Sequence, residues 1–557
     1  MLAIQTRVAK SDTLEGTLHS QIIDRTDGSA ENRFWLVTED GDSLKLHPSD
    51  GLKDSFYSLA GSDKVQLGAQ PILGAAVGGS GERSLEYVVT SVKRAIKNNQ
   101  HETLQARVDP LGVVSGSRAV AIVLVNVSTS TAVLPAVMGR DEAISALYSG
   151  THSVNGAYEA SSLDQLSFNS DKDGDGNPDV FGPYSVPMVS SPCDKVYDWS
   201  AEVLPLAQVD GLNSDAYDHV VFVMPDSQLL GCNWGGLGEM PGKFSWIAAT
   251  YSHVGLESFQ IFAHEIGHNL GLNHASIDQD RNGAINGTNE EYGDWTCLMS
   301  NGWHAKLFNA AHSMQLGWYL NYPEVVKTIS GPGSYSITLS PLELNPAQAQ
   351  SGLQIVRILP VASSDPLVLS YRQQVGTYNQ IPLQYTSGVN VIKDLGLYKN
   401  TLLLGTLTDR GTFVDPNSGI SVTQVAHDSN GVTFSVEVPL ETLSTSTIQV
   451  ASKLLQRISV IDGLIGKLSN PNSKIRKASL KAISKYSADL SAFVDQSSAQ
   501  LKANTRGPEL VNSCRSTITL LKRLLTRSAD SKLRSSVRRS LKALTLTIKQ
   551  FFTVPLS

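Results

Sequence analysis

The chain has 557 residues, of which 41% are hydrophobic and 17% are charged, and its formal net charge is −7. This length is enough for three or four domains, each with a sizeable core. No apolar run approaches the roughly eighteen residues of a membrane-spanning helix, and four cysteines are too few for a disulfide framework.

The first residues, MLAIQTRVAKSD, lack the apolar segment of a signal peptide. We expect a cytosolic protein or one whose leader has been removed, and the sequence leaves both open. The cysteines allow three full pairings, and one bridge is predicted within the middle region. No CxxC pattern occurs, so a thiolate zinc site is not predicted. The four are Cys193, Cys232, Cys297 and Cys514.

Residues 1–105 contain short β-type segments separated by polar turns, such as GTLHSQII, RFWLVTE and SLKLH. This pattern predicts a small β-rich module. Residues 106–325 alternate longer apolar strands, AVAIVLVNV and HVVFVMPD, with helical segments such as RDEAISALYSG and a helix from Glu257 to about Gly271. This alternation predicts an α/β domain.

Residues 326–440 return to alternating strands and turns, including SYSITLS, LVLSYRQ and GVTFSVEV, which predicts a β-sandwich-like domain. Residues 441–557 have apolar positions at helical spacing and predict an all-α bundle. This last segment has 20 Lys and Arg against 6 Asp and Glu, a balance of +14. The remaining 440 residues have 25 against 46, a balance of −21, so an acidic body carries a basic tail.

The segment HEIGHNLGLNHAS contains three histidines in an HExxHxxGxxH pattern. On a helix, His264 and His268 lie one turn apart on the same face, with Glu265 beside them. A straight helix would point His274 about 80° away from that face, so a turn at Gly271 is needed to bring its imidazole back. Three neutral imidazoles bind zinc and leave a fourth position for water, as in a catalytic site. Core histidines are the structural alternative, and the extended pattern favours zinc.

A second motif, EYGDWTCLMSNGW, places Met299 25 residues after His274. The two motifs together resemble the metzincin zinc endopeptidases, in which a methionine-containing turn lies beneath the metal. More narrowly, HNLGLNHA, YGDWTCLMS and FNAAHSMQLGW resemble the gametolysin family. The resemblance covers about residues 110–320, is weaker in the following β-rich part and is absent from the basic tail.

The resemblance implies an α/β metzincin catalytic domain with zinc ligands His264, His268 and His274, general base Glu265 and turn methionine Met299. Two positions depart from related families. Astacins have a glutamate after the third histidine, where this chain has Ala275. The tyrosine that astacins and serralysins carry two residues after the methionine is Asn301 here. No tyrosine donor for the transition state is therefore assigned. Tyr292, His304 and His312 are candidates, and a structural role is the favoured alternative for each.

The implied function is zinc-dependent hydrolysis of peptide bonds in extracellular, cell-wall or matrix proteins by a secreted enzyme. Glu265 would take a proton from a zinc-bound water and pass it to the leaving amine. The segment 234–250 is the expected edge strand, along which an extended substrate would pair. The resemblance also implies a pro-region in residues 1–105. Because no cysteine precedes Cys193, any latency must use something other than a thiolate.

Two other functions remain as alternatives. The first is a surface-binding or structural protein with a silent metzincin site, against which the intact Glu265 and histidines argue. The second is a thermolysin-like enzyme, which is disfavoured because His274 supplies the third ligand at the shorter metzincin spacing.

Two acidic loops predict calcium sites. The loop SDKDGDGNPDV has aspartates at positions 1, 3, 5 and 9 of an EF-hand-like pattern, and four carboxylates so close together repel unless a cation neutralises them. The loop DQDRNGAINGTNEE follows the same logic, beginning four residues after His274. The predicted ligands are Asp171, Asp173, Asp175, Asp179, Asp278, Asp280 and Asn282. A solvated acidic turn is the alternative in each case.

The basic tail is expected to form amphipathic helices with charge on the outside. Its charge predicts contact with an anionic surface, either the acidic body of the chain or a cell envelope. Nucleic acid is disfavoured because aromatic residues do not alternate with the basic ones.

Overall fold

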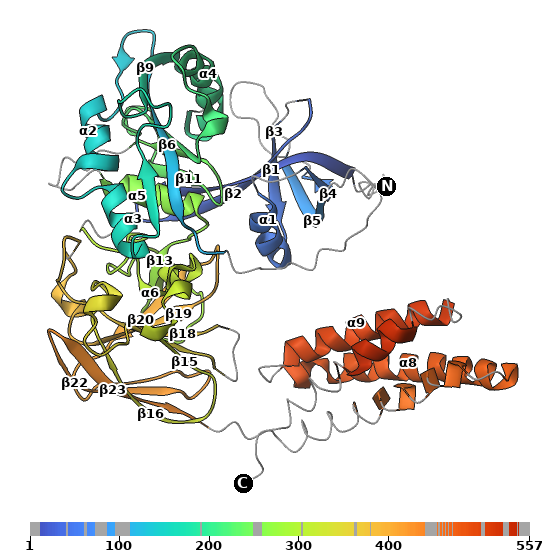
Figure 1. Ribbon diagram of the computed structural model, residues 1–557. Coiled ribbons are helices and arrows are strands. Elements are labelled where there is room, and N and C mark those ends of the chain that lie inside the picture. The colour runs from blue at the N-terminus through green and yellow to red at the C-terminus, as the bar shows by residue number, and fades with distance from the viewer. Residues whose placement is uncertain are drawn as a thin grey trace, which may run out of the picture.

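The chain forms several parts with mixed sheets and helices, shown in Figure 1 as a computed structural model. None of the helices in the described ranges is long and apolar enough to cross a membrane. The structure describes residues 12–439, except 41–42, 61–63, 73–85, 95–111, 190–191, 249–258, 302–304, 361–364 and 379, and residues 454–544 with further short gaps.

The N-terminal residues form a small β-rich unit around its own apolar core, which includes Leu18, Phe34, Phe56 and Leu67. Strand β1 is unusually long, and it pairs with both β2 and β4. Helix α1 covers this core and was not predicted from the sequence. The elements are β1 (Asp12–Arg25), β2 (Ala30–Val37), β3 (Ser43–Pro48), α1 (Lys53–Leu59), β4 (Val65–Pro71) and β5 (Glu86–Arg94).

The centre of the molecule is a sheet in which β6 and β12 flank β10 in parallel, and β11 pairs antiparallel with β12. Successive residues of β6 point to opposite faces, so Val120 and Ile122 join one core while Ala121 and Val123 join another. Both faces of the sheet are therefore buried, as predicted for the run AVAIVLVNV. The strands are β6 (Gly116–Ser128), β7 (Val133–Leu134), β8 (Leu166–Asn169), β9 (Val180–Pro187), β10 (His219–Val223), β11 (Trp234–Glu239) and β12 (Phe244–Ile247).

Helices cover both faces of this sheet. Helices α3 and α5 contribute to one core through Tyr158 and Phe262, and α4 contributes to the other through Trp199. A disulfide joins Cys193 to Cys232, which confirms a bridge within the middle region, while Cys297 and Cys514 are buried thiols. The helices are α2 (Arg140–Ile144), α3 (Val154–Ser162), α4 (Val196–Val209), α5 (Phe259–Asn269) and α6 (Ala310–Gln315).

Two sheets follow and pack around a shared core that includes Leu369, Val391 and Phe434. The order is β14-β13-β20-β19-β18-β17-β15 in the larger sheet and β16-β23-β22-β21 in the smaller. The strands are β13 (Ala275–Asp278), β14 (Asn289–Glu290), β15 (Val326–Ile329), β16 (Gly333–Leu339), β17 (Ile355–Ile358), β18 (Leu367–Tyr371), β19 (Val389–Asp394), β20 (Thr401–Thr406), β21 (Thr412–Val414), β22 (Ser421–Asp428) and β23 (Gly431–Val438).

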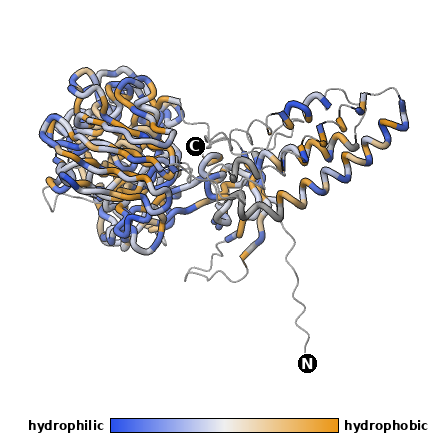
Figure 2. Tube along the Cα trace, turned by 90° about the horizontal axis from the view of Figure 1, so that it is seen from below, coloured by the Kyte–Doolittle hydropathy of each residue, from blue (hydrophilic) through white to orange (hydrophobic). Residues whose placement is uncertain are grey.

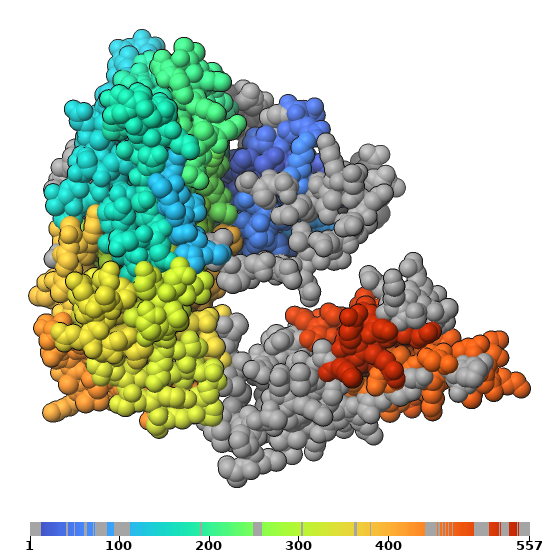
Figure 3. Space-filling view, viewed as in Figure 1, coloured from blue at the N-terminus to red at the C-terminus, as the bar shows by residue number. Residues whose placement is uncertain are grey.

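Two of the sheets contain strands from both sides of the domain boundaries that the sequence suggested near residues 105 and 325. Strand β1 continues the central sheet by pairing with β11, and the N-terminal residues pack directly against the central region in Figure 3. Strand β13, which directly follows His274, pairs with β20 of the later region. The histidine segment therefore lies where three parts of the chain meet.

The C-terminal region is helical, with α8 (Ser473–Lys502) and α9 (Gly507–Thr526) packed against each other. Apolar residues alternate with polar ones along these helices in Figure 2. Leu490, Leu521 and Val537 are fully buried in a common core, which explains the helical spacing of apolar positions in the tail.

Candidate active site

Helix α5 holds the first two histidines in a fully buried position, against β11 and β12. The helix stops where Gly271 adopts φ +91°, a left-handed conformation that favours glycine. A Cβ at Gly271 would also lie 2.7 Å from the ring of Tyr398. The turn redirects the chain so that His274, directly before β13, faces the helix again.

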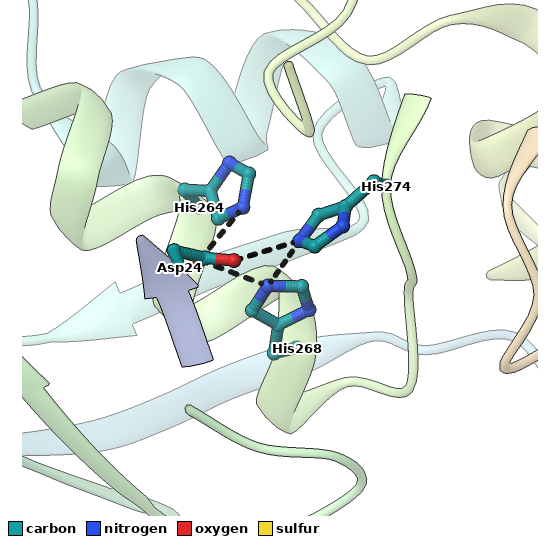
Figure 4. Close-up of side chains that lie close together, drawn as sticks. All are labelled: Asp24, His264, His268 and His274. Carbon is teal, nitrogen blue, oxygen red and sulfur yellow. Dashed lines mark hydrogen bonds and ion pairs between the residues drawn. The ribbon is translucent and has the colours of Figure 1, made fainter. Parts of the chain in front are cut away.

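The three imidazoles converge through their Nε2 atoms (Figure 4). Nε2 of His274 lies 3.2 Å from Nε2 of His268. Each opposite nitrogen, Nδ1, contacts an oxygen: His264 the carbonyl of Leu298 at 3.1 Å, and His268 the carbonyl of Leu272 at 2.8 Å. A donated Nδ1–H leaves the Nε2 lone pair available for a metal ion.

The third histidine is held by a carboxylate. Nδ1 of His274 lies 2.8 Å from Oε1 of Glu291, and Asn400 of the later region donates to the same oxygen at 3.0 Å. Burial lowers the pKa of His274, but the carboxylates of Asp24 and Glu291 outweigh it and raise that pKa to about 9. Such a carboxylate partner orients a metal-ligating imidazole and increases its basicity. Sequence reasoning did not identify Glu291 in this role.

Glu265 is almost completely buried between α5 and β11. A Cβ at Gly236 of β11 would lie 1.9 Å from Oε1 of Glu265, so only glycine allows the strand to approach the carboxylate this closely. Burial, followed by the nearby Asp24 carboxylate, raises the pKa of Glu265 well above its usual value. Oε2 of Glu265 is buried without a hydrogen-bond partner among the described residues, whereas Nε2 of His264 faces Oδ2 of Asp24 at 3.2 Å. A buried carboxylate oxygen beside three converging Nε2 atoms fits a metal ion with a water molecule next to it.

Met299 lies fully buried in the turn that supports the histidines. Its carbonyl accepts a hydrogen bond from Ala275, next to His274, at 2.8 Å. The preceding residue, Leu298, supplies the carbonyl that holds His264. The methionine turn therefore fixes two of the three imidazoles, through backbone rather than side-chain atoms.

Asp24, at the end of β1, completes the cluster and was not predicted from the sequence. Its Oδ1 lies 2.9 Å from Nε2 of His274, and its Oδ2 lies 3.2 and 3.3 Å from Nε2 of His264 and His268. Burial raises the pKa of Asp24, but the three imidazoles outweigh it and hold that pKa well below the usual range. All four side chains point to one centre in Figure 4.

The three candidates for a transition-state donor are placed very differently. The hydroxyl of Tyr292 donates to Oδ1 of Asp24 at 2.7 Å, and its ring centroid lies 4.2 Å from that of His274. His312 is buried against Sγ of Cys297, and burial lowers its pKa to about 3. His304 lies outside the described residues.

A cavity of about 160 Å³ opens beside the cluster. Residues from β1, β11, α5 and the methionine turn line it. They include Asp24, Thr26, Gly236, Gln260, Glu265, Tyr292, Asn301 and Lys306.

The first acidic loop brings three of its four predicted ligands together. Carboxylate oxygens of Asp171, Asp173 and Asp179 lie within 4.8 Å of one another, and Asp175 is outside this group. The Asp171 carboxylate also accepts from the backbone N–H groups of Gly174 and Gly176, at 2.7 and 2.9 Å. The loop is therefore wound around its carboxylates.

The second acidic loop is wound in a similar way. Oδ2 of Asp278 accepts from the N–H of Gly283 at 2.7 Å, while Oδ1 is buried without a partner in the described part of the chain. Burial raises the pKa of Asp278. Asp280 accepts from the side chain of Asn282 at 2.8 Å.

A match to one protein family covers the part of the chain that contains this site. Curated proteins and solved structures gave no match. A family model described as gametolysin peptidase M11 matches residues 123–349, a range that contains the three histidines, Glu265 and Met299. This match supports a gametolysin-like peptidase family for this region of the chain and implies metallopeptidase activity on a protein substrate.

Proposed function

We propose that the protein is a zinc-dependent endopeptidase of the metzincin type. The observation that carries this proposal is the convergence of three imidazole Nε2 atoms beside the buried carboxylate of Glu265. Nitrogen ligands that leave a further position open are typical of catalytic zinc sites. Zinc, when bound, supplies a Lewis acid that polarises the peptide carbonyl and acidifies water.

Glu265 is proposed as the general base and then the general acid. Its carboxylate would take a proton from the attacking water and deliver it to the nitrogen of the leaving amine. Burial of this side chain raises its pKa, which favours the transfer of a proton from water to the carboxylate. Gly236 supports the proposal because it leaves Glu265 room to face the cleft.

Strand β11 is proposed to hold the substrate backbone. It is the antiparallel strand next to α5, and its residues 234–239 already pair with an extended segment of this chain. A peptide in that place would gain its affinity from backbone hydrogen bonds. Tyr292 is proposed to donate a hydrogen bond to the substrate oxygen that becomes negatively charged during attack. Its hydroxyl already donates to an oxygen of Asp24, which lies beside the three imidazoles where the substrate carbonyl would be.

The rival proposal is a surface-binding protein with a silent site. Casein digestion distinguishes the two proposals. It is measured with the intact chain and with a chain that a sequence-specific protease has cut at a site inserted between Arg94 and Gly116. Hydrolysis by either form that stops with a zinc chelator and returns with zinc supports the peptidase. No hydrolysis by either zinc-loaded form would overturn it.

Glu291 is expected to strengthen zinc binding through His274. Replacing it by alanine leaves Nδ1 of His274 without its carboxylate partner, so we expect zinc affinity to fall by about 10–100-fold. Glu290→Ala is the matched control, because this neighbouring residue is exposed and its carboxylate contacts the side chain of Gln279. Competition with a chromophoric chelator measures both variants. Equal zinc affinities in the two would contradict a supporting role for Glu291.

We also propose that calcium occupies the two acidic loops. An ion that binds only the folded state stabilises it by about 2.7 kcal/mol at one hundred times its dissociation constant. We expect calcium to raise the melting temperature of the parent chain. Asp171→Asn and Asp278→Asn should each remove the portion of this increase that comes from the loop that is changed. Melting temperatures that are equal in calcium and in a calcium chelator would exclude both sites.

We also propose a class of substrate and a role for the basic tail. The gametolysin-like match favours extracellular or cell-wall glycoproteins as substrates and a secreted enzyme. The +14 balance of residues 441–557 favours contact with an anionic cell envelope. Retention of the full chain on an anionic polysaccharide, compared at low and high salt with a 1–440 truncation, measures this contact.

A further inference from the structure

The edge of the central sheet that would receive a substrate is occupied by the chain itself. Residues 21–25 of β1 pair antiparallel with residues 234–239 of β11, from Gln21 opposite Glu239 to Arg25 opposite Trp234. The N–H of Thr26 extends this contact to the carbonyl of Asn233 at 2.9 Å. A second peptide strand cannot pair with the same edge of β11 while β1 is there.

The position of Asp24 follows from an irregularity in this pairing. Asp24 lies opposite Gly236, and the register shifts between Asp24 and Arg25. Such a shift bends a strand and redirects a side chain. Here the carboxylate of Asp24 reaches the point where the three Nε2 atoms converge.

The two oxygens of Asp24 have different partners. Oδ1 contacts His274 and accepts from Tyr292, whereas Oδ2 contacts His264 and His268. The group above the imidazoles is thus a side-chain carboxylate and not a peptide carbonyl. Hydrolysis needs a peptide carbonyl at this point, so β1 can fill the cleft without being cut.

The occupying strand is anchored by a unit with its own core. The same β1 that carries Asp24 pairs with β2 and β4, and its Leu18 and Ile22 are buried in the N-terminal core. This unit also contacts the later region, where the rings of Tyr57 and Tyr398 stack with centroids 5.5 Å apart. Lys399 pairs with Asp54 at 3.0 Å. The unit that carries Asp24 is therefore attached both to β11 and to the later region of the chain.

We propose that residues 12–94 are an internal inhibitor, in which Asp24 supplies a fourth ligand to the metal and β1 fills the substrate cleft. This inference rests on the proposed peptidase function. A segment of the same chain acts at an effective concentration on the order of millimolar, so a dilute protein substrate cannot displace it. Activation requires that the unit leave the cleft, for which the chain must be cut between β5 and β6.

The proposal is tested first by a ligand-binding measurement. The full-length chain is loaded with cobalt(II) in place of zinc, and acetohydroxamate is added while the visible spectrum of the metal is recorded. We expect Asp24→Asn, which keeps the size of the side chain, to bind acetohydroxamate at least tenfold more tightly than the parent chain. Glu15→Gln is the matched control, because Glu15 is an exposed carboxylate on the same strand, and we expect it to behave as the parent.

Casein hydrolysis by the same zinc-loaded proteins gives the second readout. Asp24→Asn removes the contact between β1 and the metal, so β1 should leave the cleft more readily; we expect this variant to be at least tenfold faster than the parent chain and Glu15→Gln to be unchanged. Cutting the parent chain between Arg94 and Gly116, followed by removal of the released unit, is expected to give a similar increase. This second route does not depend on how the substitution affects folding.

The outcomes separate the two proposals. If acetohydroxamate binds the parent and Asp24→Asn equally, Asp24 is not a ligand and the inhibitor proposal is overturned. If Asp24→Asn binds it more tightly but neither that variant nor the cut chain hydrolyses casein, Asp24 is the ligand and the peptidase function fails. If the parent hydrolyses casein as fast as Asp24→Asn and the cut chain do, the peptidase proposal is supported and the inhibitor proposal is overturned.

Discussion

Replacing Glu265 by glutamine is expected to slow peptide hydrolysis by about 10²–10⁴-fold, the range typical for loss of a positioned general base. Glutamine keeps the shape of the side chain that faces Gly236, so the fold should be preserved. It cannot take a proton from water, however, and this removes the step assigned to Glu265. Zinc content should stay at one ion per chain, because Glu265 is not among the converging nitrogen donors.

Initial rates on casein and elemental analysis of the same samples measure both effects, with the chain cut between Arg94 and Gly116. Glu202→Gln, the same chemical change at an exposed position of α4, is the control and should not alter the rate. Undiminished turnover by Glu265→Gln would remove this residue from the mechanism. Loss of zinc together with activity would instead assign Glu265 to the metal site.

Replacing His268 by alanine is expected to lower zinc affinity by at least about 100-fold, more than the 10–100-fold typical for a supporting residue. His268 is fully buried, and burial lowers its pKa to about 4, which keeps the imidazole neutral and able to bind a metal. Its removal leaves two imidazoles, so casein hydrolysis should be lost together with the metal.

Competition with a chromophoric chelator gives the affinity, and thermal unfolding shows whether the variant still folds. His47→Ala is the control, because this histidine is half-exposed on β3 and lies far from the cluster in the sequence. A His268→Ala chain that keeps stoichiometric zinc at unchanged affinity would contradict the proposed ligand set.

The parts of the site that could be predicted are encoded within short segments. The spacing of His264 and His268 follows from helix geometry, and the need for a turn at Gly271 follows from the direction in which His274 must point. Buried strands such as β6 and β10 were predicted because their apolar runs are continuous. The disulfide was predicted only to lie in the middle region, since spacing alone does not select one partner for Cys193.

The parts that were missed depend on contacts between distant segments. Asp24 precedes His264 by 240 residues and lies next to the last residue of β1, so no local pattern distinguishes it from other aspartates near turns. Tyr292 was one of three candidate donors in the sequence, and its contact with Asp24 depends on where β1 docks. The absence of a cysteine before Cys193 was the one available hint, since it required a different blocking group.

X-ray absorption at the zinc edge of the zinc-loaded, full-length chain identifies the ligands of the metal. We expect three imidazole nitrogens and one carboxylate oxygen, at about 2.0–2.2 Å from the metal. Asp24→Asn should keep the three imidazoles while changing the oxygen contribution. Fewer than three imidazole ligands, or sulfur in the first coordination sphere, would contradict a metal centre built from His264, His268 and His274.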